Sequence, residues 1–387
     1  MNISRKHLII TLAVFLVLTA TLITFFVLKQ KTFTIAFYNT PESVQKTIIK
    51  ATEDFFLAQS KIEGKKTSSI NLKTLALSTE QPINKQLTGR NKPDLLICPA
   101  GYAANQAINL AQINKAGVSM EHLSQMPPFV ADSASIKDKK VFALPLLIDH
   151  YELAINRGKD GNPQLLLAGG NPQILMAFVG AIAESQFGLE AAKELILDCQ
   201  EHKAQDIPLI HEIAKILANA ITQGYLPQQA LNMNQEELIF YIEKSSPNHV
   251  FMPLSFHRLL PFEPLKKYDS HFLPSSKQTI RALTAPVYYG IPLSGKKKEI
   301  STLEGLFAQL TSIEGQGFLS QATGLAPTHA SAPTPDVQAD DVRYWVAATN
   351  LPLPALSDAS FSTSSELATF ASDFRNLVLE YVHSNSR

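Results

Sequence analysis

The sequence predicts an α/β protein preceded by an N-terminal transmembrane helix. Three observations predict this class. Strand-like and helix-like segments alternate after residue 33, an uncharged apolar run occupies residues 8–28, and 45% hydrophobic with 18% charged residues is an ordinary globular composition. At 387 residues, the chain is long enough for two domains of ordinary size.

The balance of charge excludes two classes of protein. The chain carries 34 basic and 34 acidic residues, so its formal net charge is zero. A disordered chain combines low hydrophobicity with high net charge, and neither property is present. Nucleic acid binding requires a basic face, yet the longest basic block is the lysine run at 296–298. We therefore expect a folded protein with no nucleic acid partner.

The apolar run at residues 8–28 predicts a single-pass anchor in the cell membrane, within residues 1–32. At a rise of about 1.5 Å per residue, a helix of this length spans the roughly 30 Å hydrocarbon layer of a bilayer. Arg5 and Lys6 precede the run, which favours a short cytoplasmic N-terminus and an extracytoplasmic remainder. No Cys lies near the run, so lipid attachment is not expected. Cleavage of the run as a secretory signal is the alternative.

Residues 33–113 are predicted to form alternating strands and helices. A strand at 33–38 runs into Asn39 and Thr40, either of which can cap a helix over 43–58. Strands follow at 70–77 and 93–98, and the second of these is an uninterrupted apolar run of the buried parallel type. A helix is predicted at 103–113. This alternation predicts βαβ units and a parallel sheet.

The rest of the chain continues the mixed pattern. Extended segments at 141–147 and 151–155 are broken at Asp149 and His150. Helices are predicted at 173–184, 189–203, 208–220 and 234–243, and extended structure at 250–252 and 282–291. A helix at 300–311, a glycine-rich turn and a final helix at 366–382 complete the prediction.

Motifs for catalysis or metal binding are incomplete. Residues 290–297 read GIPLSGKK, which places Lys297 where a phosphate-binding loop carries a hydroxyl for Mg²⁺. The ten His residues lack the spacing of a metal site. Tyr288 and Tyr289 are expected to point to opposite faces of a strand, which favours packing over iron binding. We therefore expect no enzyme activity, no metal and no cofactor.

The chain has two cysteines, Cys98 and Cys199. Cys98 ends an apolar run and Cys199 lies in a helical pattern. One disulfide would suit an oxidising compartment, but nothing in the sequence pairs the two residues. Two separate buried thiols are the preferred prediction.

Several segments show a family pattern when they are taken in order. They read DLLI at 94–97, FALPLLIDHYELAIN at 142–156, APVYYGIP at 285–292 with KKE at 297–299, TSIEGQ at 311–316, and GLAP at 324–327. Together they resemble the extracellular solute-binding proteins that serve ABC importers, especially the sugar- and oligosaccharide-binding class. In that family, the segments similar to 142–156 and 285–292 cross between two lobes.

The resemblance implies two interleaved α/β lobes of the periplasmic-binding-protein type. The first lobe would comprise residues 33–147 and 287–328, and the second would comprise residues 148–286 and 329–387. Proteins of this family bind their ligand in the cleft between the lobes, which close around it by a hinge motion.

Carried over position by position, the resemblance implies a set of ligand contacts just after apolar strands or at the crossover. Open sheets present their ligand contacts at such strand ends. The implied contacts are Asn39, Thr40, Tyr102, Asp149, Phe256, His257, Tyr288 and Phe361. Asn39 and Thr40 could instead cap the following helix. Tyr102 could pack within a lobe, and Asp149 could be an exposed hinge charge.

These expectations combine into one preferred function and one alternative. The preferred function is a membrane-tethered extracytoplasmic protein that captures a small polar solute, with a carbohydrate as one candidate, and delivers it to ABC permease subunits. Sugar-binding members usually stack sugar rings on tryptophan, yet this chain has one, Trp345, so the ligand class stays open. The alternative is a sensor or surface interaction protein that reuses the scaffold without transport.

Overall fold

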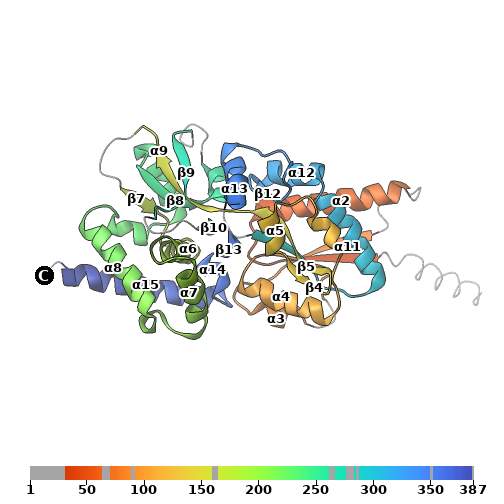
Figure 1. Ribbon diagram of the computed structural model, residues 1–387, viewed down its shortest axis with the longest axis horizontal. Coiled ribbons are helices and arrows are strands. Elements are labelled where there is room, and N and C mark those ends of the chain that lie inside the picture. The colour runs from red at the N-terminus through yellow and green to blue at the C-terminus, as the bar shows by residue number, and fades with distance from the viewer. Residues whose placement is uncertain are drawn as a thin grey trace, which may run out of the picture.

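The structure, a computed structural model, describes residues 31–62, 70–88, 92–158, 164–260, 266–275, 283–284, 287–348 and 352–385. Two sheets, each with its own hydrophobic core, lie side by side along the long axis of the molecule (Figure 1). We call the seven-stranded sheet and its core the first lobe, and the four-stranded sheet and its core the second lobe. This arrangement confirms the predicted α/β class with interleaved lobes.

The first lobe is built on a mixed sheet with the strand order β12-β5-β11-β3-β1-β2 and β4 paired to β5. Strands β1, β2 and β3 are parallel, as predicted, but β11 runs antiparallel to both β3 and β5. The parallel pairing predicted within residues 33–113 is thus confirmed, and the returning strand β11 makes the complete sheet a mixed one. The strands are β1 (Lys31–Phe37), β2 (Ile70–Ala76), β3 (Leu95–Pro99), β4 (Ser135–Lys137), β5 (Lys140–Ile148), β11 (Val287–Pro292) and β12 (Ala326–Pro327).

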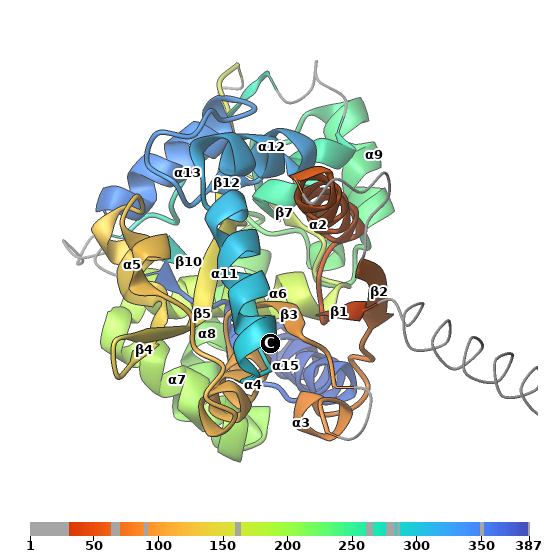
Figure 2. The ribbon, with the colours of Figure 1, turned by 90° about the vertical axis from the view of Figure 1, so that its right-hand side faces the viewer.

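Helices cover this sheet because their apolar residues recur at helical spacing. In α2, Val44, Ile48, Ala51 and Phe55 are buried on one face, which packs against α11 and α12. Figure 2 views this lobe end-on, with α11 in front and α2 and α12 above it. The helices of the lobe are α2 (Glu42–Ile62), α3 (Ile83–Gln86), α4 (Tyr102–Ile113), α5 (Pro128–Ser133), α11 (Lys297–Leu310), α12 (Ile313–Thr323) and α13 (Val337–Ala348), with a 3₁₀ turn at Met120–Leu123.

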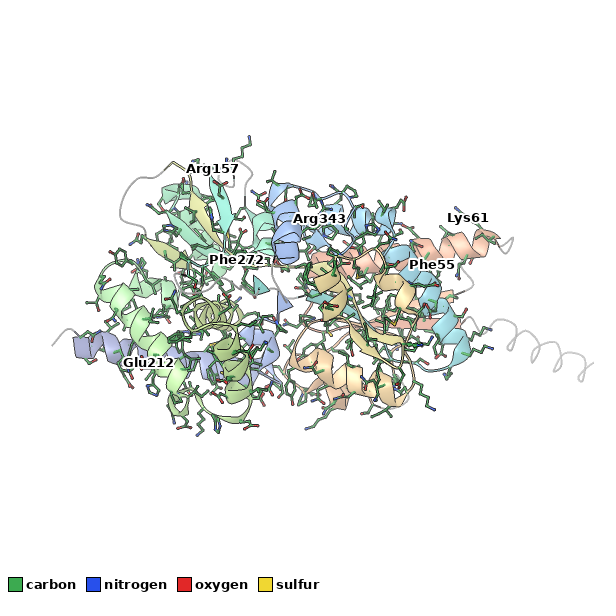
Figure 3. All side chains as sticks on the ribbon, in the orientation of Figure 1. Phe55, Lys61, Arg157, Glu212, Phe272 and Arg343 are labelled. Atoms are coloured by element: carbon green, nitrogen blue, oxygen red, sulfur yellow. The ribbon has the colours of Figure 1, made fainter. Side chains whose placement is uncertain are left out.

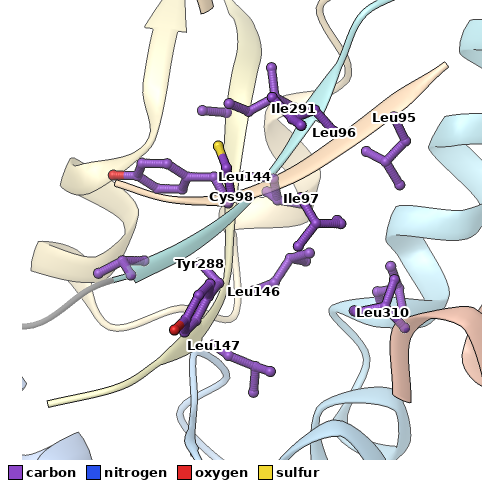
Figure 4. Packing of buried hydrophobic residues seen from close by; sticks show 14 of the residues in the cluster. Leu95, Leu96, Ile97, Cys98, Leu144, Leu146, Leu147, Tyr288, Ile291 and Leu310 are labelled. Atoms are coloured by element: carbon purple, nitrogen blue, oxygen red, sulfur yellow. The ribbon is translucent and has the colours of Figure 1, made fainter. Parts of the chain in front are cut away.

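The core of the first lobe lies where β3, β5 and β11 meet. All five residues of β3 are buried, which accounts for its uninterrupted apolar sequence. Figure 4 shows β3 side chains packed with Leu144 and Leu146 of β5 and Ile291 of β11. Burial of this apolar surface is the main force that holds the three strands together.

The second lobe has the strand order β7-β8-β6-β9 and is rich in helices. Phe370, Phe374 and Val378 of α15 pack in the same core as Ile213 and Leu217 of α8. Its elements are β6 (Tyr151–Asn156), β7 (Leu165–Leu167), α6 (Pro172–Ile182), a π-helical turn (Ala183–Phe187), α7 (Leu189–Glu201), a 3₁₀ turn (Ala204–Asp206), α8 (Pro208–Thr222), a 3₁₀ turn (Gln228–Leu231), α9 (Gln235–Ser245), β8 (His249–Pro253), η5 (Leu254–Leu259), β9 (Tyr268–His271), α14 (Leu356–Ala359) and α15 (Ser364–Asn385).

The chain passes between the lobes more than once. It leaves the first sheet after β5 and enters the second sheet at β6, returns before β11, and passes again between α13 and the short strand β13 (Pro352–Leu353), which pairs with β10 (Leu283–Thr284). Helix α13 lies near this junction, where Arg343 donates to the carbonyl oxygens of Ala330 and Ala332 (Figure 3). The lobes are thus joined by adjacent crossovers rather than by one linker.

Helix α14 packs against both lobes, and at each of these two contacts the facing residue is a glycine. A Cβ atom on Gly101, at the start of α4, would overlap the carbonyl oxygen of Asp358. A Cβ on Gly180 of α6 would lie 2.9 Å from the Cβ of Leu356. Because one glycine belongs to each lobe, the absence of two side chains lets α14 contact both lobes at once.

One sequence prediction is corrected by the structure, and two short strands were not predicted. The glycine-rich segment after residue 311 is the helix α12, whose first turn is capped by the Ser312 hydroxyl accepting from Gly315 N. The short strands β7 and β9 were not predicted. They are only 3 and 4 residues long, too short to show a period.

Two further expectations have different outcomes. Cys98 and Cys199 are free and buried, one in each core, as predicted. Within the described ranges, no helix has the length and apolar character needed to cross a membrane. The predicted transmembrane segment at residues 8–28 lies outside the described residues and stays a prediction.

Substitution of Gly101 by Ala should destabilise the protein more than the same change at Gly224. Both glycines have positive φ, 133° and 80°, which costs an L-residue about 1–2 kcal/mol. Only Gly101 also places the new methyl group against α14, whereas Gly224 faces open space. We expect a loss of about 3 kcal/mol or more in the free energy of unfolding for Gly101→Ala in denaturant titrations. Equal losses in the free energy of unfolding for Gly101→Ala and Gly224→Ala would contradict the close packing of α14 against Gly101.

Candidate functional site

A cleft of about 890 Å³ lies between the lobes, within the size range of small-molecule sites. The first lobe contributes the ends of β1 and β3 and the first turn of α2. The second lobe contributes the first turns of α6 and α9 and the segment after β8. The side chains that reach the cleft include Phe37, Asn39, Thr40, Gln45, Asp149, Tyr151, Asn171, Gln173, Gln235, Ser255, Phe256, Tyr288 and Asp358.

Five of the residues predicted from the sequence line this cleft: Asn39, Thr40, Asp149, Phe256 and Tyr288. They come from β1, the β5–β6 crossover, η5 and β11, so the fold brings together segments far apart in the sequence. Their contact with a ligand stays a prediction.

The other three predicted residues lie elsewhere. Tyr102 begins α4 and is absent from the described lining of the cleft. Phe361 lines a side pocket of about 70 Å³ and packs its ring against Phe370 at 5.2 Å. His257 lies in η5, but its side chain is outside the described part of the structure.

Asn39 and Thr40 use their side chains for tertiary contacts. The Asn39 amide donates to Asp358 Oδ1 at 2.9 Å, and the Thr40 hydroxyl lies within hydrogen-bond distance of the carbonyl oxygens of Tyr38 and Ile97. Asn39 also has a positive φ of 46°, a conformation that Asn tolerates better than most residues. These bonds fix the loop between β1 and α2 and turn it toward the second lobe.

Asp358 is the most constrained acidic group of the cleft. Its Oδ1 accepts one hydrogen bond from Asn39 of the first lobe at 2.9 Å and another from Gln173 of the second lobe at 2.8 Å. The residue is only 9% exposed, so the carboxyl group is largely removed from water. This carboxyl group therefore joins the two lobes inside the cleft.

Burial raises the pKa of Asp358 to about 7, from an ordinary value of 3.8. The nearby Asp149 carboxyl raises the pKa further, whereas the hydrogen bonds from Gln173 and Asn39 oppose the rise. The effect of desolvation on this pKa is larger than that of the hydrogen bonds, because two neutral amide donors do not replace the hydration of a carboxylate. The cleft thus contains an acid that ionises near neutral pH.

Asp149 lies at the crossover and is buried, with 3% exposure, so it is not the exposed hinge charge that the sequence left as an alternative. Its Oδ1 accepts from Ser255 N at 2.9 Å. Desolvation and the charges of Asp358 and Asp149 raise the pKa values of Tyr151 and Tyr288 well above the ordinary value for tyrosine. Both phenols therefore keep their protons and can donate hydrogen bonds.

Tyr288 and its neighbour on β11 confirm the predicted alternation of faces. Tyr288 lines the cleft, while the Tyr289 hydroxyl donates to the carbonyl oxygen of Ser133 at 2.7 Å, on the other side of the strand. Residues 290–292 lie inside β11, and Lys296 is largely exposed. The segment is therefore a buried strand followed by a solvated turn rather than a phosphate-binding loop.

The side pocket adjoins the cleft and shares Asn39, Gln173 and Asp358 with it. At its rim, Ser364 N at the start of α15 donates to the carbonyl oxygen of Thr79 at 2.8 Å. This is a second direct link between the lobes. Like the link through Asn39, it joins the N-terminal part of the first lobe to a residue near the C-terminus.

Sequence reasoning missed Gln173, Asn171, Tyr151 and Asp358. Asn171 caps α6 directly after the end of β7, so it repeats the strand-polar-helix pattern seen at Asn39. That signal could have found Asn171 and Gln173 if β7 had been recognised. Asp358 lies in a helix of 4 residues with no periodic pattern, and no sequence signal marked it.

The arrangement suits recognition of a polar solute through hydrogen bonds. The lining combines amide and hydroxyl groups with three carboxyl groups, those of Glu42, Asp149 and Asp358, and four aromatic rings. Among the described lining residues the one basic side chain is Lys46, which pairs with Glu42 at 2.7 Å at the exposed rim. The described ranges also contain no cluster of side chains that could hold a metal ion.

No family model and no curated protein matches the sequence. Solved structures match it over nearly the whole chain. The bacterial solute receptor AcbH, described as preferring β-D-galactopyranose, is 10% identical with a TM-score of 0.66 and covers 92% of this chain and 99% of its own. A chitin oligosaccharide binding protein is 12% identical with a TM-score of 0.63, at 91% and 99% coverage.

A third similar structure is maltose-bound MalE3 of T. maritima, which is 14% identical with a TM-score of 0.53 and covers 91% of this chain and 99% of its own. All three are named as binding a solute or carbohydrate. At these identities the matches show that the chain has the two-lobed fold of such proteins.

Replacement of Asp358 by Asn should change how stability depends on pH. The raised pKa means that the folded state binds this proton more tightly than the unfolded state, so stability is lost as pH rises from about 4 to about 7. The full shift corresponds to on the order of 4 kcal/mol. We expect the stability of Asp358→Asn to exceed that of the wild type by an amount that grows across this window and is constant above it.

Unfolding midpoints measured in denaturant between pH 4 and pH 8 would check this slope. Asp54→Asn is the matched control, because Asp54 lies on the surface of α2 and pairs with Lys50. If the unfolding midpoints of the wild type and of Asp358→Asn change equally with pH, the Asp358 carboxyl group does not have the raised pKa.

Proposed function

We propose that this protein is a solute-binding receptor that captures a small polar solute between its lobes and delivers it to an ABC permease. The observation that carries this proposal is the 890 Å³ cleft, because polar side chains of both lobes line it. The fold shared with AcbH and the chitin oligosaccharide binding protein makes carbohydrates the first class to test. Residues 8–28 would tether the receptor to the membrane with its lobes outside the cytoplasm.

The mechanism is reversible closure of the lobes with no bond made or broken. The hydrogen bond from Asn39 to Asp358 joins the two lobes beside the cleft. A solute that contacts both lobes adds free energy to the closed state only, and therefore shifts the population toward it. Closure also presents a loaded receptor to a permease in one defined shape.

The described lining of the cleft is partly aromatic and includes no tryptophan. Tyr151, Phe256 and Tyr288 are all buried at the cleft, and each can offer a ring face or edge to a sugar. The neutral amides of Gln173 and Gln235 offer both a donor and an acceptor to hydroxyl groups. This combination favours an uncharged polyhydroxylated solute.

A thermal-shift screen tests the proposal. At least one of galactose, chitobiose and maltose, or another neutral sugar in a wider panel, should raise the unfolding midpoint at millimolar concentration. A ligand at 100 times its Kd stabilises the folded state by about 2.7 kcal/mol, which is easily measured. No shift with any sugar at 10 mM would contradict the carbohydrate proposal.

A variant that fills the cleft locates the binding site. Ser255 lines the cleft and is half-buried, so Ser255→Trp should occupy the cleft and abolish the ligand-induced shift. Ser372→Trp is the matched control, because Ser372 is exposed on α15. Retained binding in Ser255→Trp would place the solute elsewhere. Binding without any solute uptake in transport assays would favour a sensor over a transport receptor.

A further inference from the structure

The first lobe has an end that faces away from the cleft, where several elements begin or finish. Strands β1, β2 and β3 are parallel and begin there, as does β5, while the antiparallel strand β11 ends there. Helices α2 and α4 end on this side of the sheet and α11 begins on it. Figure 2 looks onto this surface. We call residues 61–62, 113–115, 137–140 and 294–298 the outer end of the first lobe.

Exposed lysines from four separate segments meet at the outer end. They include Lys61, Lys115, Lys140 and the run at 296–298. The Asn114 amide donates to the carbonyl oxygen of Leu293 at 3.1 Å, which places Lys115 next to the lysine run. Figure 3 shows Lys61 at the extremity of the first lobe, on the side away from the second lobe. The fold thus assembles a basic surface that no single stretch of sequence contains.

Acidic side chains at the outer end offset only part of this charge. Asp94 is half-buried in the sheet, where its Oδ2 accepts from Thr34 N at 2.8 Å. Glu299 pairs with Lys296 at 3.0 Å, and Asp138 is exposed. The outer end therefore keeps an excess of positive charge, although the formal net charge of the whole chain is zero.

Two exposed isoleucines lie at the same end. Ile62, the last residue of α2, is 88% exposed, and Ile113, the last residue of α4, is 77% exposed. These are the highest exposures of large apolar side chains in the described part of the chain. Lysines combined with exposed apolar residues are typical of surfaces that lie on a membrane. A nucleic acid would use the charge of the outer end but not its isoleucines.

The predicted anchor brings this end close to the membrane. Strand β1 begins at Lys31, three residues after the apolar run that ends at residue 28. An extended chain spans at most about 3.6 Å per residue, so the start of β1 would lie within roughly 11 Å of the run. That distance is close to the Debye length at physiological ionic strength, about 8 Å, so charges near the start of β1 would interact with the lipid surface.

We propose that the outer end of the first lobe docks on anionic phospholipid headgroups, with its lysines near the phosphates and Ile62 and Ile113 at the boundary of the acyl chains. This inference rests on the membrane tether of the proposed function and is independent of which solute the cleft binds. Docking holds the first lobe against the lipid. The second lobe lies at the other end of the long axis and stays away from the lipid (Figure 1).

A fluorescent label near the outer end reports docking in the full-length protein. The protein is reconstituted in nanodiscs that carry a quencher on a lipid headgroup, made of phosphatidylcholine or of its equal mixture with phosphatidylglycerol. Ser301→Cys on α11 carries the label, and Ser372→Cys on α15 is the matched site in the second lobe, because both residues are exposed. The native thiols Cys98 and Cys199 are buried, which keeps labelling selective.

We expect the label at Ser301→Cys to be quenched more strongly in the anionic nanodiscs than in the neutral ones. The label at Ser372→Cys should show no such difference. The extra quenching should fade between about 0.1 M and about 1 M salt, since the Debye length falls from about 10 Å to about 3 Å.

Charge reversal separates the lysines from the tether. Each lysine near an anionic surface favours binding by about five-fold, so Lys297→Glu/Lys298→Glu should lower the ratio of docked to free lobe at least about ten-fold. Acidic residues suit the first turn of a helix, so α11 should still fold. Lys203→Glu/Lys244→Glu changes the net charge equally at exposed sites of the second lobe and should dock like the wild type. Equal docking by both variants would overturn the proposal.

Replacement of the isoleucines tests the contact with lipid. Ile62→Gln/Ile113→Gln should lower docking several-fold, because the apolar side chains no longer leave water. The control is Leu197→Gln/Phe240→Gln, which changes residues of the second lobe that are 61% and 57% exposed. If Ile62→Gln/Ile113→Gln docks as tightly as the wild type, the outer end responds to charge alone, and the assignment to a lipid surface rather than to another polyanion fails.

The outcomes separate this inference from the proposed function. Equal quenching of the label at Ser301→Cys in neutral and anionic nanodiscs would overturn the docking and leave the tether and the capture of solute intact. A full-length protein that alkaline carbonate removes from membranes would contradict the tether, and this inference with it. Solute binding in the cleft would still stand on its own thermal-shift result.

Discussion

The structure depends on one buried carboxyl group held between two lobes. Asp358 accepts hydrogen bonds from Asn39 on one side and Gln173 on the other, and it lies in a helix that fits only because Gly101 and Gly180 lack side chains. A carboxyl group in this place is costly in free energy when it is ionised. The fold thus keeps a group that is costly to bury at the place where the two lobes meet.

The interleaved chain explains why so many distant residues converge there. Strands β1 and β3 end at the same edge of the first sheet because they are parallel, and the crossover after β5 brings Asp149 to the same place. The returning strand β11 adds Tyr288, and the last crossover brings in α14. Each lobe has its own hydrophobic core, so the cleft lies between two separately packed units.

The sequence predicted those elements whose burial leaves a periodic pattern. The apolar run of β3, the helix at α2 and the break at Asp149 were predicted correctly, and five of the eight candidate residues line the cleft. Helix α12 was missed because its Gly315 and Gly317 suggest a turn, although Gly317 fits a close contact with Pro333. Asp358 was beyond prediction because its role comes from tertiary packing of a short helix, which leaves no local pattern.

A crystal structure of the protein with a bound solute at pH 8 tests the central claim most directly, namely that the cleft captures a solute through both lobes. The account predicts a closed molecule with the solute in the cleft, in contact with residues of both lobes such as Gln173 and Tyr288. A solute bound outside this cleft, or a cleft that is closed and empty while the solute is present at saturation, would contradict it.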